Sequence, residues 1–231
     1  ARNVLEDGQH ALIPRPAYHH FQMAMEGAER SYSYYSFDLV NHRWTLNIDH
    51  LEKSIQPNTR LIMLCNPHNP GGTVLHQEEI ERINELAKKN NIIVCSDEIH
   101  ADLLLDEEIR HFPIGKDISA NQTTIGLMSM NKAYNFPGIG LGWAVIANPT
   151  LRARFSKGLH TLIPGPNLFA YEATLAAIKG GQEWHKELII YLRQNRDLVE
   201  EWVQRYPLLK MAHLPATYLA WIDASALPEI D

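Results

Sequence analysis

The stretch TRLIMLCNPHNPGGTVLHQEEIERINELAKKNNIIVCS, residues 59–96, decides the fold class. Residues 59–65 form an apolar run of strand length, and residues 91–96 form a second one. Within residues 77–90, between these runs, apolar side chains recur at helical spacing. They are Ile80, Ile83, Leu86 and Ala87. The order strand, helix, strand predicts a βαβ unit, and strands that are apolar on both faces are typical of parallel sheets covered by helices. The sequence therefore predicts an α/β fold with a mainly parallel sheet.

Further apolar runs at residues 123–129 and 141–147 predict two more strands, and residues 10–16 also resemble a strand. After Pro149 the pattern becomes helical. Three helices are expected, at residues 149–159, at residues 167–179 and from about Trp184 to Tyr206.

We predict a large domain over residues 1–185, followed by an interdomain helix and the start of a smaller α/β domain over residues 186–231. The first strands of the smaller domain would lie in residues 210–214 and 217–224. The chain begins without a methionine and stops soon after a strand-like run, so we expect it to be part of a longer protein.

The composition limits the possible partners. A hydrophobic fraction of 45%, a charged fraction of 21% and a net charge of -6 are typical of a soluble globular protein. No lysine or arginine cluster provides an electrostatic footprint for nucleic acid or for an anionic membrane. Cytoplasm is the default location. Cys65 and Cys95 end apolar runs, where cysteine usually acts as a small buried hydrophobe rather than as part of a disulfide framework.

The polar residues that follow the strands point to a site. In open α/β sheets, ligands bind at the carboxyl ends of the strands. There the sequence places Asn69 after residues 59–65, Asp97 after residues 91–96 and Lys132 after residues 123–129. We expect these side chains to converge on one crevice.

An amide, a carboxylate and a lysine in one crevice suit pyridoxal phosphate. Its aldehyde needs a lysine, here Lys132, for a Schiff base, and its pyridine nitrogen needs an acidic partner, here Asp97. Asn69 would donate to the phenolic oxygen. Ser129 would offer its hydroxyl to the phosphate, although capping of the strand end is an equally good interpretation.

The segments NPHNPGG (66–72), SDEIHADL (96–103) and SMNKAYNFPGIGLG (129–142) resemble the motifs of fold type I pyridoxal phosphate enzymes, the aspartate aminotransferase superfamily. The resemblance covers nearly the whole chain. With the helix around LRQNRDLV (192–199) and the following PATYLAWID (215–223), it is greatest to the carbon-sulfur β-lyases of the cystathionine β-lyase type, which belong to the class I/II aminotransferases.

This resemblance implies that Lys132 carries the cofactor, that Asp97 pairs with the ring nitrogen and that Asn69 binds the phenolic oxygen. It also implies that Tyr18 stacks on the ring and that His100 reaches the phenolic edge. Tyr18 could instead be a core residue, and a lone histidine is more often structural. Members of the family share the site across a homodimer, so self-association is expected.

The sequence also departs from the family's pattern. Many members carry an arginine for the phosphate eight residues after the lysine, where this sequence has Gly140. Asn131 stands where the lyases usually have serine. Phosphate binding would therefore rely on Ser129 and on groups outside the given sequence.

The resemblance favours β-elimination from a small amino acid substrate, with transamination as the alternative. In both reactions Lys132 would take the Cα proton. A truncated domain without catalytic activity is a further alternative. A divalent metal at the carboxylates and imidazole of residues 97–102 is less well supported, because no HExxH motif or second histidine-carboxylate group accompanies them.

Two Asn-Pro steps lie beside the expected site, and X-Pro bonds adopt the cis form at low cost. We predict that Asn69-Pro70 is cis in preference to Asn66-Pro67, because the bend would aim the Asn69 amide into the crevice.

Overall fold

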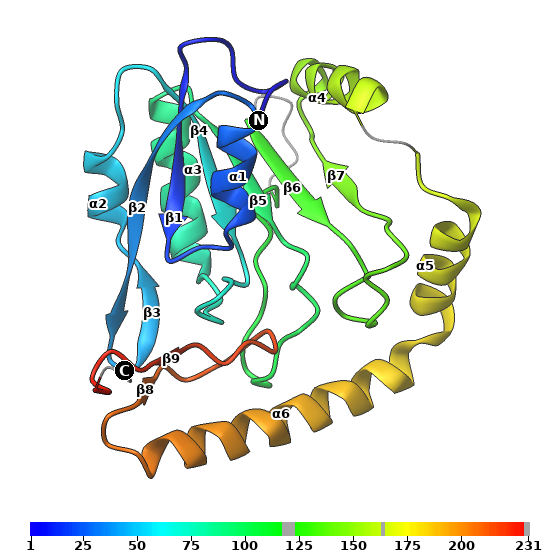
Figure 1. Ribbon diagram of the computed structural model, residues 1–231. Coiled ribbons are helices and arrows are strands. Elements are labelled where there is room, and N and C mark those ends of the chain that lie inside the picture. Colours follow the sequence, from blue (N-terminus) through cyan, green and yellow to red (C-terminus); the bar gives the residue numbers. More distant parts are fainter. Residues whose placement is uncertain (117–122, 163–164, 229–231) are drawn as a thin grey trace.

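The architecture is that of an α/β protein built on one large sheet (Figure 1). The computed structural model describes residues 1–116, 123–162 and 165–228. The sheet has seven strands. In spatial order they are β3 (Arg43–Leu46), β2 (Ser31–Val40), β1 (His10–Arg15), β4 (Thr59–Cys65), β5 (Ile93–Asp97), β6 (Thr124–Met128) and β7 (Trp143–Val145). The strands β2, β1, β4, β5 and β6 are parallel, and only the outer strands β3 and β7 pair antiparallel to their neighbours. The predicted α/β fold with a mainly parallel sheet is confirmed.

Helices cover both faces of the sheet, which explains why its strands are apolar on both sides. The covering helices are α1 (His20–Glu26), α2 (Ile48–Lys53), α3 (Gln77–Lys89) and α4 (Pro149–Leu162). On one face, buried residues of α2 and α3 pack with Leu12 of β1 and Ile62 of β4. On the other face, residues of α1 and α4 pack with Ile13 of β1 and Leu61 of β4. Successive residues of one strand therefore enter opposite cores.

The βαβ unit read from the sequence is present as β4, α3 and β5. The buried residues of α3 are the four that the periodicity selected. Glu79 closes the first turn of α3 by accepting a hydrogen bond from the backbone N–H of His76, at 2.7 Å. Strand β7 is shorter than the predicted run 141–147, and the later strands β8 (Lys210–Met211) and β9 (Ile222–Asp223) have two residues each.

The last helices lie apart from the sheet. Figure 1 shows α5 (Leu168–Gly180) beyond the β7 edge, and α6 (Gln182–Gln204) running from α5 to β8 past the carboxyl ends of the parallel strands. At the start of α6, Trp184 stacks on Tyr134 of the segment after β6, with ring centroids 6.1 Å apart. The position of α6 therefore depends on the loops at this edge of the sheet.

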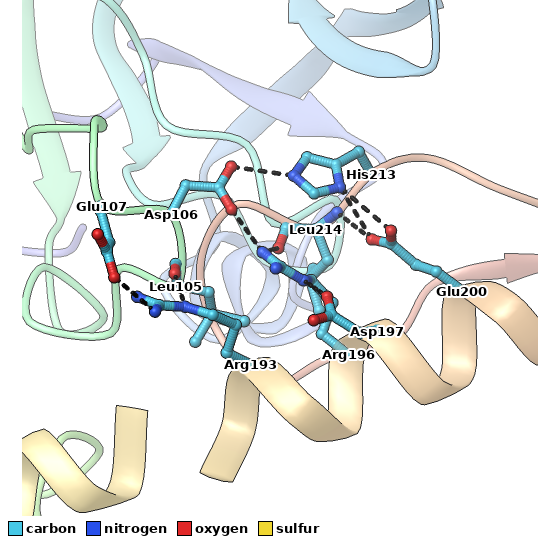
Figure 2. Close-up of polar contacts among 9 residues, drawn as sticks. All are labelled: Leu105, Asp106, Glu107, Arg193, Arg196, Asp197, Glu200, His213 and Leu214. Carbon is cyan, nitrogen blue, oxygen red and sulfur yellow. Dashed lines mark hydrogen bonds and ion pairs between the residues drawn. The ribbon is translucent and has the colours of Figure 1, made fainter. Parts of the chain in front are cut away.

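A polar cluster attaches the middle of α6 to the loop after β5 (Figure 2). Arg196 forms an ion pair with Asp106, and Asp106 also accepts from His213 at 2.9 Å. Arg193 donates to the backbone carbonyl of Leu105 at 2.7 Å, and Glu200 pairs with His213 at 3.0 Å. The cluster joins the helix, the loop after β5 and the segment after β8.

The segment after β8 also reaches the loop after β4. Gly72 has a φ of +69°, and a Cβ atom there would come within 2.1 Å of Leu214 Cδ1 and 3.0 Å of the Ala216 carbonyl oxygen. Ala216 in turn forms a β-bridge with Leu104. The C-terminal segment is thus packed on two of the loops that follow the central strands.

Candidate active site

The carboxyl ends of β4, β5 and β6 lie side by side. The register pairs Cys65 with Asp97 and Asp97 with Leu127, so these three strands end at nearly the same level. Asp97 is the last residue of β5. Asn69 and Lys132 stand in the segments that continue from β4 and β6, and Tyr18 follows the neighbouring β1. Parallel pairing places all four residues at one edge of the sheet.

Asp97 and Lys132 are close enough to interact electrostatically. Burial raises the pKa of the Asp97 carboxyl; the Ile99 amide and the Lys132 ammonium act in the opposite direction, while the Glu98 carboxylate reinforces the increase. The only hydrogen bond to the Asp97 side chain within the described part of the chain comes from Ile99 N, at 3.3 Å. Lys132 is half-buried and forms no hydrogen bond or ion pair with a described residue. A polar ligand between them would use both groups.

His100 lies on the same side of the site. It is 2% exposed, and its Nδ1 has no hydrogen-bond partner among the described residues. Burial, followed by the nearby Lys132 ammonium, lowers the pKa of His100 to about 4, so the imidazole is neutral at pH 7. Its ring meets the Tyr218 ring edge to face, with centroids 6.0 Å apart. Tyr218 had not been selected from the sequence, because it stands more than 100 residues further along the chain.

The other predicted site residues are placed as follows. Tyr18 is 36% exposed immediately before α1, so its ring surface is only partly covered. The Asn69 carboxamide has no hydrogen-bond partner within residues 1–116, 123–162 and 165–228. Ser129 donates its hydroxyl to the Leu141 carbonyl at 2.7 Å and accepts from Asn131 N at 3.2 Å. This geometry is that of a strand-end cap, the second of the two interpretations drawn for Ser129.

The bond Asn69-Pro70 is cis, as predicted. Asn66-Pro67 and Arg15-Pro16 are also cis, so the expected difference between the two Asn-Pro steps is absent.

Comparison with known families identifies the fold. The family model for aminotransferase class I and II matches residues 2–229. The chain belongs to this family.

The similar members of the aminotransferase class I and II family include lyases. Cystathionine beta-lyase PatB of Bacillus subtilis is 31% identical over 227 residues, which are 96% of this chain and 58% of PatB. The structure titled "Crystal Structure of OvoB" is 40% identical with a TM-score of 0.93, and the match covers 98% of this chain and 60% of that one. Cystalysin from Treponema denticola, whose structure contains pyridoxal 5'-phosphate, is 29% identical with a TM-score of 0.90, with 98% and 58% covered. The chain thus spans less than two thirds of the length of these relatives.

The position of the family's phosphate-binding arginine is open in this chain. Gly140 is exposed, and a Cβ atom placed there would meet nothing within 4 Å among the described residues. A side chain would therefore fit without displacing a neighbour.

Sequence reasoning missed a buried polar group beneath the site. Glu98 and Asn66 are 2% and 0% exposed, and both contact His111. The only signal in the sequence is a second carboxylate next to Asp97. His111 lies 13 residues after Glu98 and has no periodic relation to it. The described residues hold no group of three or more histidines, cysteines or acidic residues placed to bind a metal.

Proposed function

We propose that this protein is a pyridoxal phosphate-dependent enzyme that acts on amino acids, most directly as a carbon-sulfur β-lyase of the cystathionine β-lyase type. The observation that supports this proposal is the half-buried Lys132, which has no partner among the described residues, next to the half-buried Asp97 at the carboxyl end of β5. Membership of the family, and the lyases among the similar proteins, support the choice.

The chemistry of the side chains fits this cofactor. Within the described part of the chain, Lys132 offers a side chain without a partner, Asp97 a carboxylate with a single hydrogen bond and His100 a buried Nδ1 without a partner. Buried polar groups are normally satisfied, so unsatisfied groups gathered at one edge indicate a ligand. Asn69 adds an unbonded carboxamide, and Tyr18 adds a half-open aromatic face for stacking.

Bound pyridoxal phosphate would supply an electron sink for the charge that develops when a bond to the substrate Cα breaks. Asp97 would accept the ring N–H, and this new cation would oppose the effect of burial and keep the carboxyl ionised. Asn69 would donate to the phenolic oxygen, and the neutral His100 would present Nδ1 to the same edge. Lys132 Nζ would hold the cofactor covalently and, once released by the substrate amine, would take the Cα proton.

The residues named above provide few ligands for the phosphate of the cofactor. The Ser129 hydroxyl donates to Leu141 O, so it could serve the phosphate only by giving up this bond. The position of Gly140 offers no cation. We infer that the remaining phosphate ligands come from the part of the protein outside the given sequence.

Elimination at a carbon-sulfur bond would release thiol, pyruvate and ammonia, whereas the alternative, an amino acid aminotransferase, would return the proton to the cofactor. A truncated domain without activity is the alternative of another class. The name of the family supports the aminotransferase, and the name of the relative PatB supports the lyase.

The deciding experiment uses the full-length protein with added pyridoxal phosphate. An absorption band in the visible region, fixed on Lys132 after borohydride reduction and peptide mapping, is expected. Cystathionine should then yield pyruvate, while amino donors with keto acids should not react. Transamination without pyruvate would reverse the assignment of the reaction, and labelling spread over surface lysines would overturn the cofactor site.

We also propose that the protein forms a homodimer through α5. This helix exposes apolar side chains on several sides: Leu168 (70% exposed), Phe169 (75%), Tyr171, Leu175 and Ile178. Contiguous apolar surface of this kind is typical of an interface, and a second copy would cover it. The substitution Phe169→Glu should shift a sedimentation profile from dimer to monomer, and an unchanged profile would place the interface elsewhere.

We also propose that the protein is cytoplasmic and that the large domain ends near residue 185. No helix in the described ranges is long and apolar enough to cross a membrane.

A further inference from the structure

A buried chain of hydrogen bonds lies beneath Asp97. Glu98 Oε1 accepts from Ile114 N at 2.8 Å, and Glu98 Oε2 contacts His111 Nε2 at 3.2 Å. The other ring nitrogen, His111 Nδ1, lies 3.4 Å from Asn66 Nδ2. The Glu98 side chain is 1% exposed and that of His111 is 11% exposed, so their hydrogen bonds are shielded from water.

One assignment of the hydrogen atoms satisfies the donors and acceptors of these hydrogen bonds. Asn66 Oδ1 accepts from Leu75 N at 3.0 Å, which turns the Asn66 Nδ2 group toward Phe112 O and His111. A carboxamide nitrogen only donates, so His111 Nδ1 must be the acceptor, and the ring proton is on Nε2. His111 Nε2 then donates to Glu98 Oε2 and Ile114 N donates to Glu98 Oε1, so both oxygens of the buried Glu98 side chain accept a hydrogen bond.

Glu98 is held on the opposite side of β5 from Asp97. Along residues 93–98, Val94, Ser96 and Glu98 are buried on one face, while Ile93, Cys95 and Asp97 alternate with them on the other. The backbone between the two carboxylates is fixed as well: Asn66 N donates to Asp97 O at 3.0 Å, and Glu98 N donates to Leu127 O at 2.8 Å. The anchor at Glu98 therefore sets the direction in which Asp97 points.

We propose that Glu98, held by His111 and Asn66, is a positioning residue for Asp97 and places a second negative charge behind it. The proposal rests on the proposed function, in which Asp97 meets the protonated ring nitrogen of the cofactor. A carboxylate next to Asp97 favours any cation bound in front of it, because like charges on one side of the site attract the opposite charge on the other.

Two cysteines and one lysine are the other titratable side chains that interact with this pair or with its neighbours among the described residues. Burial raises the pKa of Cys65 and of Cys95 far above neutrality, so both remain uncharged thiols. Lys132 lies close enough to Asp97 and His100 to influence the pKa of both.

The test uses the full-length protein reconstituted with pyridoxal phosphate and follows the pH midpoint of the visible absorption of the bound cofactor. Glu98→Gln keeps the shape of the side chain but removes its charge. Loss of a nearby negative charge disfavours the protonated form of the chromophore, so the midpoint should move to lower pH by about 0.5–1 unit. His111→Lys, which cancels the charge by pairing with Glu98, should move it in the same direction even if Glu98→Gln does not fold.

Two control variants separate charge from structure. Glu98→Asp keeps the charge but shortens the side chain, so it should lower the melting temperature while moving the midpoint less than Glu98→Gln does. Glu108→Gln removes the same charge from an exposed position of the following loop, where solvent screens it, and should change neither quantity.

The possible outcomes distinguish the inference from the proposed function. If the unsubstituted protein gives no visible band, the proposed function fails. If the band forms and neither Glu98→Gln nor His111→Lys moves its midpoint, Glu98 has only a structural role and the inference is overturned.

Discussion

The contact between Gly72 and the C-terminal segment can be tested with a set of three glycine substitutions. Gly72→Ala should suffer two penalties: the left-handed φ of +69° and the overlap of the new Cβ with Leu214 Cδ1, at 2.1 Å. Gly8→Ala has the first penalty only, because φ is +78° and no described atom lies within 4 Å. Gly138→Ala has neither penalty.

The differences in unfolding free energy between these variants separate the cost of the left-handed backbone from the cost of the overlap. Every glycine-to-alanine change stabilises by reducing the entropy of the unfolded chain, and this contribution cancels in the comparison. The left-handed conformation costs an alanine roughly 1–2 kcal/mol, which separates Gly8→Ala from Gly138→Ala. Overpacking in a buried site costs about 1–3 kcal/mol, which separates Gly72→Ala from Gly8→Ala. For a chain of this size, each kcal/mol lowers the melting temperature by roughly 2–4 °C.

Thermal unfolding followed by circular dichroism measures these differences, and a double-mutant cycle with Leu214→Ala identifies the clashing atom. Removal of the Leu214 side chain should recover most of the overpacking cost in the Gly72→Ala background. Additivity of the two substitutions within about 0.5 kcal/mol would refute the packing of the C-terminal segment on the loop after β4.

Three further predictions concern the site and the polar cluster. Lys132→Ala should abolish the visible band and borohydride labelling with little change in melting temperature; a band of unchanged intensity would exclude Lys132 as the point of attachment. Gly140→Arg should tighten pyridoxal phosphate binding about 10-fold, the value of one charge-assisted hydrogen bond, and unchanged affinity would mean that position 140 does not face the phosphate. Burial would lower the pKa of His213, but Asp106 and Glu200 outweigh burial and raise this pKa. The interaction of protonated His213 with these carboxylates therefore stabilises the folded state fully below the ordinary pKa near 6.5. This stabilisation is lost as the pH rises through the folded-state pKa. His213→Gln should therefore flatten the decline in melting temperature between pH 6 and pH 9, and a decline equal to that of the unsubstituted protein would contradict this.

The sequence was most informative where one physical requirement dominated. In α3 the need to bury one face produced the spacing that selected Ile83 and Leu86, and both are buried. The apolar run of β4 stops where Asn66 begins, so its limits could be read directly. Strand β2 was missed because its alternating serines and tyrosines carry hydroxyl groups, although Tyr35 and Phe37 are fully covered.

For the candidate site, the strand-end rule brought Asn69, Asp97 and Lys132 to one edge because it depends only on the parallel order of the strands. The contacts of individual side chains depend on partners that no pattern indicates. The hydroxyl of Ser129 is used by the Leu141 carbonyl 12 residues later. The direction of a hydrogen bond between loops cannot be predicted from spacing alone.

The polar cluster at α6 has a consequence for the order of events during synthesis. Its ion pair between Arg196 and Asp106 joins positions 90 residues apart, and His213 lies 107 residues from the same carboxylate. Ribosomes add about 5–20 residues per second, so the loop after β5 waits roughly 5–20 s before its partners leave the exit tunnel. During that interval β4, α3 and β5 can pair locally, whereas the acidic loop stays uncovered. The ion pair with Arg196 and the contact with His213 can cover Asp106 only after both residues have been synthesised.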